Sequence, residues 1–236
     1  DMTSYFGDYR WYSGYGGGAF CDIGSNATFI NCQIIGNRTF GGMSGLGGEL
    51  TDERNIEPLV PFEMPSYGGG VYCAANPTVT FTECTFEENI TSEVDPADPN
   101  HRLDPYVGYG GGVCGESSAT LTFVDCNFVE NQADSGGGIY VNSSSATIID
   151  CNVTSNTALR GGGFLGSNSA IVDMIGSNVT NNWATTDVND PNDDFICTQG
   201  AGLGCWSLAG NIQDCNVNGN RSDYSGGGAF LRDVSG

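Results

Sequence analysis

The residues most suited to covalent chemistry in this sequence are its ten cysteines, which fall largely into two regular series. Members of the first series precede those of the second by 11, 11, 12 and 10 residues. An even number of regularly spaced cysteines is typical of disulfide frameworks in secreted proteins. We predict the bridges Cys21–Cys32, Cys73–Cys84, Cys114–Cys126, Cys205–Cys215 and Cys151–Cys197. Bridges between equivalent cysteines of neighbouring repeats are the alternative, because spacing does not fix connectivity.

Seven Asn-x-Ser/Thr triplets offer attachment sites for N-linked glycans. Together with the cysteines they indicate the secretory route and an extracellular or cell-surface location. We expect glycans on Asn26, Asn142, Asn152 and Asn178. The triplets at Asn37, Asn89 and Asn220 are weaker candidates, because these asparagines occupy a repeated position at which we expect an internal ladder.

The charged residues of the chain are almost all acidic. Aspartate and glutamate number 28, against 7 arginines and no lysine, which gives a formal charge of −21. Binding to nucleic acid or to an anionic membrane surface requires clustered cations, so we expect neither partner. The sequence has no apolar run of about 18 residues, so we also expect no membrane span.

One series of mostly acidic residues recurs immediately before the second cysteine series. Its members are Asn31, Glu83, Asp125, Asp150, Gly176 and Asp214. If the repeats stack, these residues form a strip that could bind calcium or act as acid and base on a polysaccharide. We expect instead a solvated acidic rim and no catalytic residue, because the arginines are scattered and His101 is the single histidine.

A second acidic segment offers oxygen ligands of the kind that calcium prefers, at Asp187, Asp190, Asp193 and Asp194. Their spacing matches no EF-hand loop, and Asp, Asn and Pro are common turn formers, so we expect a solvated loop. With no CxxC pair and one histidine, the sequence predicts no transition-metal site. Calcium is therefore the one metal ion that these residues suit, and N-linked glycans are the expected modification.

A recurring glycine triplet decides the fold. Triplets begin at Gly16, Gly68, Gly110, Gly136, Gly161 and Gly226, with the variant Gly200-Ala201-Gly202 in the remaining position. They start 52, 42, 26, 25, 39 and 26 residues apart, so the unit has about 25 residues and the excess is insertion. Short Val, Ile, Phe and Thr runs closed by Gly and Asn are typical of strands and turns. We predict a parallel β-solenoid of about six to seven coils, with the long loops leaving one edge.

Stacked repeats would bring equivalent residues into contact. We predict a core of two columns: Phe29, Phe81, Phe123, Ile148, Met174 and Ile212, and Ile34, Phe86, Phe128, Val153, Val179 and Val217. The columns lie five positions apart, which reverses the side-chain direction of a straight strand, so we infer a corner or bulge between them. The recurring asparagine would form an internal ladder of Asn37, Asn89, Asn131, Asn156, Asn182 and Asn220.

The repeats cover the chain as one domain over residues 1–236, with insertions at about 41–67, 90–107 and 185–199. Neither end carries the polar cap that solenoids use to shield open strand edges. We therefore expect each end to meet more protein, either neighbouring repeats of a longer chain or another copy stacked head to tail.

The pairing of Gly-Gly-[Ala/Val/Ile] with [Phe/Val/Ile]-x-x-Asn resembles the repeats of the chlamydial polymorphic outer membrane proteins. Phe86-Glu87-Glu88-Asn89 and Phe128-Val129-Glu130-Asn131 match the Phe-x-x-Asn form of that family as they stand. The resemblance implies a right-handed parallel β-helix and a role in adhesion or surface structure. The glycosylation triplets and cysteine series depart from the bacterial pattern and favour a eukaryotic surface protein.

These observations favour a non-enzymatic, glycosylated extracellular module of structural or adhesive function, a subunit of a surface fibre assembled end to end. A polysaccharide lyase or hydrolase is the alternative, since this fold class hosts many activities. Ice binding is a weaker alternative, suggested by the threonine column Thr28, Thr80, Thr122 and Thr147. Polysaccharide or a cell surface would be the partner of an adhesive module.

Overall fold

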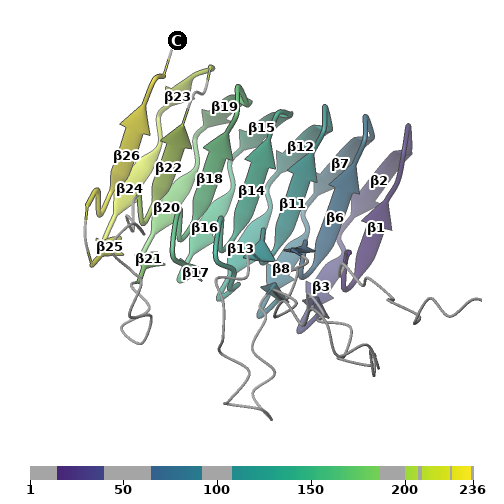
Figure 1. Cartoon of the computed structure of the whole chain (residues 1–236), viewed down its shortest axis with the longest axis horizontal. Coiled ribbons are helices and arrows are strands. Elements are labelled where there is room, and N and C mark those ends of the chain that lie inside the picture. Colours follow the sequence, from purple (N-terminus) through teal and green to yellow (C-terminus); the bar gives the residue numbers. More distant parts are fainter. Residues whose placement is uncertain are drawn as a thin grey trace, which may run out of the picture.

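The protein is a right-handed parallel β-helix, as the computed structural model shows for residues 15–39, 65–91, 108–185, 200–206, 209–223 and 225–234. The coils succeed one another from the N-terminal to the C-terminal end of the rod (Figure 1). All strand pairing between coils is parallel, which confirms the predicted solenoid. Within these residues no helix is long and apolar enough to span a membrane.

Three sheets enclose the core, and we call them the first, second and third walls. The first wall is, in spatial order, β1 (Ala19–Cys21), β6 (Val71–Ala74), β11 (Val113–Glu116), β14 (Ile139–Asn142), β18 (Phe164–Ser167), β22 (Leu203–Trp206) and β26 (Ala229–Arg232). The second wall is β2 (Asn26–Ile30), β7 (Thr78–Thr82), β12 (Thr120–Val124), β15 (Ser145–Ile149), β19 (Ile171–Ile175) and β23 (Ile212–Gln213). The third wall is β3 (Gln33–Ile35), β8 (Thr85–Glu87), β13 (Asn127–Val129), β16 (Asn152–Thr154), β20 (Asn178–Thr180) and β24 (Asn216–Asn218).

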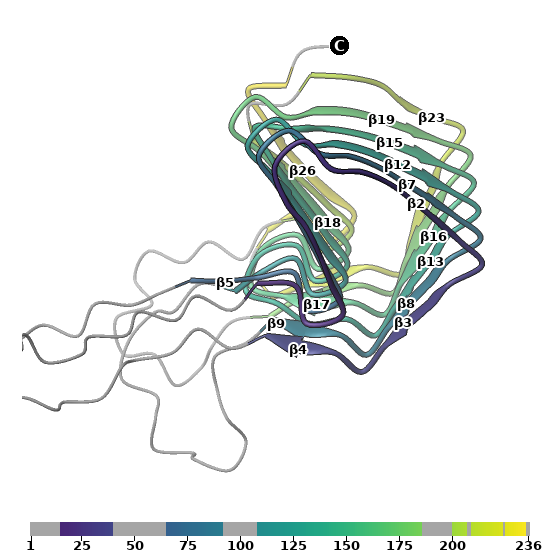
Figure 2. The same cartoon turned by 90° about the vertical axis from the view of Figure 1, so that its right-hand side faces the viewer.

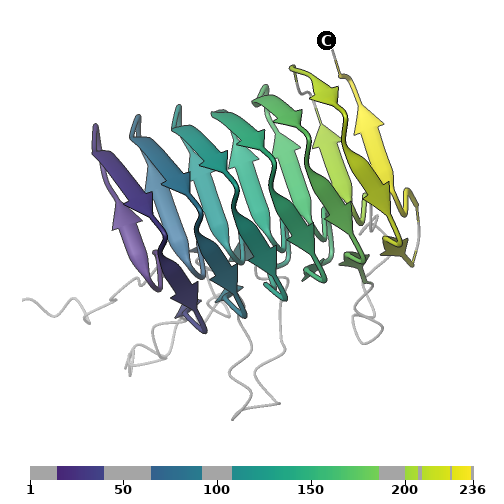
Figure 3. The ribbon, with the colours of Figure 1, turned by 180° about the vertical axis from the view of Figure 1, so that it is seen from behind.

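Shorter strands complete each coil between the third wall and the next glycine triplet. They are β4 (Arg38–Thr39) with β9 (Ile90–Thr91), β17 (Thr157–Ala158) with β21 (Trp183–Ala184) and β25 (Arg221–Ser222), and β5 (Ser66–Tyr67) with β10 (Gly108–Tyr109). Figure 2 shows the walls end-on, and Figure 3 shows the second and third walls from outside. The predicted insertions lie mostly outside the described residues, and each joins the end of one coil to the next triplet.

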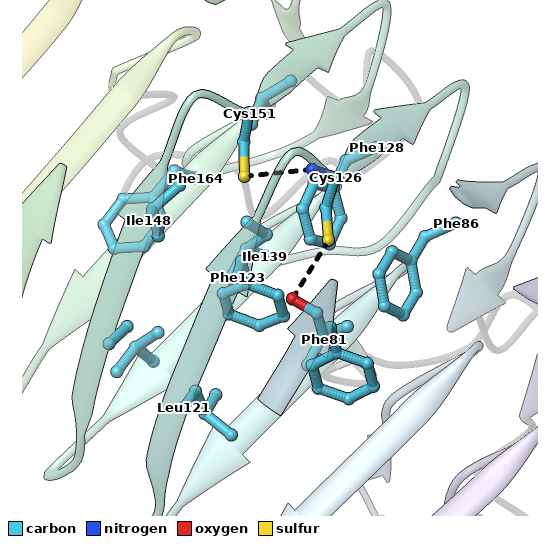
Figure 4. Close-up of a cluster of buried hydrophobic side chains, with 14 of the residues drawn as sticks. Phe81, Phe86, Leu121, Phe123, Cys126, Phe128, Ile139, Ile148, Cys151 and Phe164 are labelled. Atoms are coloured by element: carbon cyan, nitrogen blue, oxygen red, sulfur yellow. Dashed lines mark hydrogen bonds between the residues drawn. The ribbon is translucent and has the colours of Figure 1, made fainter. Parts of the chain in front are cut away.

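The register of the walls confirms the predicted core columns. Phe29, Phe81 and Phe123 are direct partners in the second wall, as are Ile34, Phe86 and Phe128 in the third. The ring centroids of Phe86 and Phe128 lie 4.6 Å apart with an interplanar angle of 1°. Phe81 and Phe123 are likewise stacked, at 5.2 Å (Figure 4). Both columns therefore face one interior, where identical rings lie on one another.

The corner that the sequence required lies at the residue before each second-series cysteine. Backbone φ is positive there, between 52° and 54° at the non-glycine positions Asn31, Glu83, Asp125, Asp150 and Asp214. A left-handed residue turns the chain between the second and third walls and restores the inward direction of the next apolar side chain. Asn and Asp tolerate this conformation better than most residues, which accounts for the polar identity of the column.

The glycine triplets are fixed by two different constraints. The first glycine has positive φ, for example 66° at Gly110, so it turns the chain into the first wall. The second and third approach the next coil closely. A Cβ built on Gly111 would lie 2.3 Å from the carbonyl oxygen of Gly137, and one on Gly112 would lie 2.6 Å from that of Gly138. Any larger residue would therefore push the coils apart.

Candidate functional surfaces

The repeated asparagine forms a continuous ladder inside the helix, as predicted. Each backbone N–H and each side-chain Nδ2 donates to the Oδ1 of the asparagine one coil further on, and Nδ2 also donates to a carbonyl of the preceding coil. At Asn131 these contacts are 2.9 Å from Nδ2 to Asn156 Oδ1 and 2.9 Å to the oxygen of Phe86. Asn89 donates to Asn131 Oδ1 at 2.9 Å and is fully buried. The ladder is structural and leaves no free group for chemistry.

The predicted glycan sites differ in their surroundings. Asn26 is exposed, whereas Asn142 is half-buried. The side chain of Asn142 donates a hydrogen bond to Glu116 and accepts one from Asn168. Asn152 and Asn178 are exposed neighbours in the third wall, and Asn178 Nδ2 donates to Asn152 Oδ1 at 3.0 Å. The buried ladder position of Asn89 disfavours a glycan there, and Asn37 and Asn220 are partly buried ladder members. The glycans on Asn26, Asn142, Asn152 and Asn178 remain predictions.

The direct pairing of Asn152 with Asn178 narrows the expectation of a glycan on each of them: we expect a single molecule to carry a glycan on at most one of the two. Their strands lie about 4.8 Å apart, which is less than the width of a branched glycan core. The measurement is glycopeptide mass spectrometry on secreted protein. Molecules glycosylated at both positions would contradict the stacked register of β16 and β20.

The structure places the cysteines according to their distance from the glycine triplet. Cys21, Cys73 and Cys205 follow their triplets by three residues and point into the core. Cys114 follows by two, and its partners in the first wall are Tyr72 and Tyr140, so it lies on the outer face. A one-residue shift reverses the side-chain direction in a strand. The structure therefore does not bring Cys114 to Cys126, which lies in the core.

Equivalent cysteines of adjacent coils are neighbours. Cys21 pairs directly with Cys73, and the backbone N–H of Cys126 donates to Cys151 Sγ at 3.4 Å. This is the alternative arrangement considered for the bridges. Burial raises the pKa of the Cys205 thiol to about 12, which makes it unreactive. The nine described cysteines are free thiols in the structure, and Cys197 lies outside the described residues. The placement of Cys114 on the outer face is incompatible with the predicted bridge Cys114–Cys126, and the other four bridges stay predictions.

An aromatic cluster covers the outer face of the first wall at the N-terminal half of the rod. Tyr67 stacks on Tyr109 at 5.4 Å, and Tyr109 lies 4.8 Å from Tyr140. Tyr72 is 7% exposed and its hydroxyl donates to Glu116 Oε2 at 3.2 Å. Burial raises the pKa of the Tyr72 hydroxyl above its ordinary value, and the nearby Glu116 raises it further. The cluster was not among the expectations from the sequence, although a tyrosine immediately before three of the triplets was a signal for it.

Glu116 is the titratable group most constrained by this cluster. Burial raises the pKa of its carboxyl, and the hydrogen bonds from Asn142 and Tyr72 offset part of that rise. A carboxyl whose pKa is higher in the folded than in the unfolded state stabilises the fold most when the pH lies below the unfolded-state pKa. Stability is therefore lost as the pH rises through the folded-state pKa.

Replacing Glu116 by glutamine is expected to remove this loss, because the amide oxygen still accepts a hydrogen bond and carries no charge. At pH 7 the thermal midpoint should rise by on the order of 2 °C, and its decline with pH above the ordinary value of 4.5 should flatten. The measurement is thermal unfolding by circular dichroism at several pH values, with Glu83→Gln on the exposed corner as the control. An unchanged pH profile in Glu116→Gln would contradict the assignment.

The predicted acidic column is present as an exposed row at the corner between the second and third walls. Glu83, Asp125, Asp150 and Asp214 are all exposed. The part of the chain that the structure describes contains no group of three or more potential metal ligands. The calcium candidates Asp187, Asp190, Asp193 and Asp194 lie outside that part. The position of the row on a convex corner suits the solvated rim that we expected.

The threonine column lies in register on the outer face of the second wall. Thr28, Thr80, Thr122 and Thr147 are successive partners, and Asp173 follows Thr147. Asp173 Oδ1 accepts hydrogen bonds from Asn211. The regular hydroxyl row therefore ends in the fifth coil at a carboxylate, which counts against an extended ice-binding face.

The two ends of the rod expose apolar side chains that the middle coils bury. At the N-terminal end Phe20 is 49% exposed, whereas the residues in register with it in the next coils, Tyr72, Cys114 and Tyr140, are buried. At the C-terminal end Leu231 is 54% exposed, whereas its partner Cys205 is buried, and Ile212 is exposed as well. In the middle coils the residue equivalent to Ile212 is fully buried, as at Phe81 and Phe123. Each end therefore exposes apolar side chains whose equivalents are buried where two coils stack.

Comparisons with known proteins give no match: no family model, no curated protein and no solved structure is significantly similar to this chain.

Proposed function

We propose that this chain is a non-enzymatic structural or adhesive module of an extracellular glycoprotein, which builds a surface fibre by end-to-end contact. The observation that carries the proposal is the exposure, at both ends of the rod, of apolar side chains whose equivalents are buried between coils, at Phe20 and Leu231 for example. Open ends of a solenoid are covered in most repeat proteins, because unpaired strand edges and apolar faces associate. Contact between unlike ends does not close on itself and so generates a filament.

The interior supports a mechanical role. Every described coil is joined to its neighbours by parallel strand pairing. The asparagine ladder also links the first six coils, and stacked core rings link the first three. Stability in such a rod comes from the interfaces between coils, so longer stacks are more stable than short ones. A fibre made of such rods would resist separation along its axis through the same contacts.

Imaging of native material by electron microscopy, combined with intact-mass analysis, tests this proposal. We expect filaments with a coil spacing of about 4.8 Å along the axis and a mass that includes N-linked glycans. Because each copy carries a charge of −21, association should strengthen when salt screens the repulsion between copies. Dispersed, glycan-free monomers at all salt concentrations would contradict the proposal.

A polysaccharide-active enzyme is the second candidate, and Glu116 is the observation in its favour. A carboxyl with a raised pKa beside aromatic rings has the properties of a general acid. Polysaccharide depolymerisation should be assayed with and without calcium for the wild type and Glu116→Gln. Activity that is lost in the variant would favour the enzyme over the structural module.

A further inference from the structure

Two pairs of cysteines bring thiols of adjacent coils into contact inside the rod. Cys21 is the direct partner of Cys73 in the first wall, and both side chains lie in the core. Cys126 and Cys151 occupy equivalent positions of consecutive coils before the third wall, where the backbone N–H of Cys126 donates to Cys151 Sγ at 3.4 Å (Figure 4). Hydrogen bonding with the neighbouring thiol lowers the pKa of Cys21 and of Cys126, which shows how close the sulfur atoms are in each pair.

The stacking distance suits a disulfide bond. Neighbouring strands of a sheet lie about 4.8 Å apart, and the Cα atoms of bridged cysteines usually lie about 4.4–6.8 Å apart. Cys21 and Cys73 project from the same face of the first wall at directly opposed positions. A bond between them therefore needs rotation of the two side chains and no shift of the backbone.

A bridge within one coil would have to span the length of the second wall. Between Cys21 and Cys32 the chain runs through the whole of β2, whose five residues extend over about 17 Å. The five residues of β7 separate Cys73 from Cys84 in the same way. Cysteines whose Cα atoms lie more than about 7 Å apart cannot be bridged without movement of the backbone. The stacked pair Cys21–Cys73 is therefore better placed than either bridge within a coil.

Cys126 has a stacked cysteine on each side, Cys84 and Cys151, and its contacts with the two differ. Its thiol interacts with the thiol of Cys151, but with the backbone of Cys84. The next residue of the column after Cys151 is Ser177, whose Oγ accepts from the N–H of Cys151 at 3.1 Å. Within the described residues, Cys126 is thus the one cysteine stacked on Cys151. The contacts of both residues favour the pair Cys126–Cys151.

We propose that Cys21–Cys73 and Cys126–Cys151 form disulfide bonds that hold adjacent coils of the rod together. This rests on the extracellular location in the proposed function, because disulfides persist in oxidising compartments. Cys21 and Cys73 lie 52 residues apart, across the insertion at about 41–67, where consecutive coils are joined by the longest stretch of chain. A bond at this place links two coils directly where the chain itself constrains them least.

The bonds form by thiol–disulfide exchange with a small disulfide such as oxidised glutathione. A thiolate of the pair attacks one glutathione sulfur and releases the other glutathione as a thiolate. The second cysteine, as its thiolate, then attacks the protein sulfur of this mixed disulfide and releases the second glutathione. The pair loses two protons and two electrons, and oxidised glutathione is reduced to two thiols. Because the four cysteines are buried in the folded rod, we expect exchange while the coils assemble.

Peptide mapping of refolded protein tests the pairing. Fully reduced protein is refolded from urea in a buffer of reduced and oxidised glutathione, remaining thiols are alkylated, and linked peptides are identified by mass spectrometry without reduction. We expect the links Cys21–Cys73 and Cys126–Cys151. Links from Cys21 or Cys126 to any other cysteine, or alkylation of all four residues, would overturn the proposal.

Replacing Cys151 by serine tests one bond through stability. The variant should fold, because Ser177 already occupies the equivalent position of the next coil. Oxidation should raise the thermal midpoint of the wild type, and Cys151→Ser should lose on the order of 5 °C of that rise. Cys114→Ser is the matched control, because Cys114 lies on the outer face and its replacement should leave the rise unchanged. The full wild-type rise in Cys151→Ser would overturn the bond Cys126–Cys151.

Mapping of native protein separates this inference from the proposed function. The expected links in refolded protein, with free thiols at the same positions in native protein, would refute the extracellular location and leave the pairing intact. Other disulfide pairings in both samples would refute the proposed bonds and leave the proposed function standing, since disulfides of any pairing indicate an oxidising compartment.

Discussion

Replacing Phe128 by alanine is expected to lower the free energy of unfolding by about 3–5 kcal/mol. Phe128 is fully buried, stacks on Phe86 at 4.6 Å and meets the edge of Phe123 at 5.3 Å (Figure 4). Removing the ring eliminates packing contacts between its coil and both neighbouring coils. The backbone hydrogen bonds between coils keep the surrounding residues from closing the cavity that the ring leaves. Urea unfolding followed by circular dichroism measures the loss.

Ile23→Ala is the matched control for Phe128→Ala. Ile23 is 75% exposed, so its truncation should change the unfolding free energy by no more than about 0.5 kcal/mol. A loss below about 1 kcal/mol in Phe128→Ala would mean that the ring does not lie between stacked coils.

Replacing Asn131 by alanine should destabilise the protein by about 3 kcal/mol or more. The side chain accepts from Asn89 and donates to Phe86 and Asn156, so its removal leaves several buried groups without partners. Each unsatisfied buried group costs about 1–3 kcal/mol. Thermal and urea unfolding measure the effect.

The control for Asn131→Ala is Asn152→Ala, which removes an exposed asparagine with a similar neighbour contact. Asn152 Nδ2 donates to Asn127 Oδ1 at 2.9 Å, but water can replace that bond. We expect a change within about 0.5 kcal/mol for Asn152→Ala. Equal losses in the two variants would show that burial of the inner ladder is not what makes it stabilising.

Much of this fold was predictable because stacking turns sequence period into spatial contact. The column through Phe81 and Phe123 and the ladder through Asn89 and Asn131 follow from spacing alone. The corner at Asp125 was inferred from the parity of the two columns, but its position needed the backbone, because a left-handed residue and a bulge restore parity equally well.

The cysteines show where sequence reasoning was incomplete. The spacing of 12 between Cys114 and Cys126 looked like one more member of the series, but the extra residue puts Cys114 on the outer face of the first wall. The distance from the triplet, two residues rather than three, held this information. The tyrosine cluster escaped for a related reason. Its members come from two segments, before and after the triplet, and they meet only because the first glycine turns the chain.

Fibre diffraction from aligned native filaments is the most direct test of a rod built from stacked coils and extended end to end. We predict a meridional reflection at about 4.8 Å, since the strands lie across the filament axis at that spacing. Filaments without this reflection, or with strands running along the axis, would contradict the account.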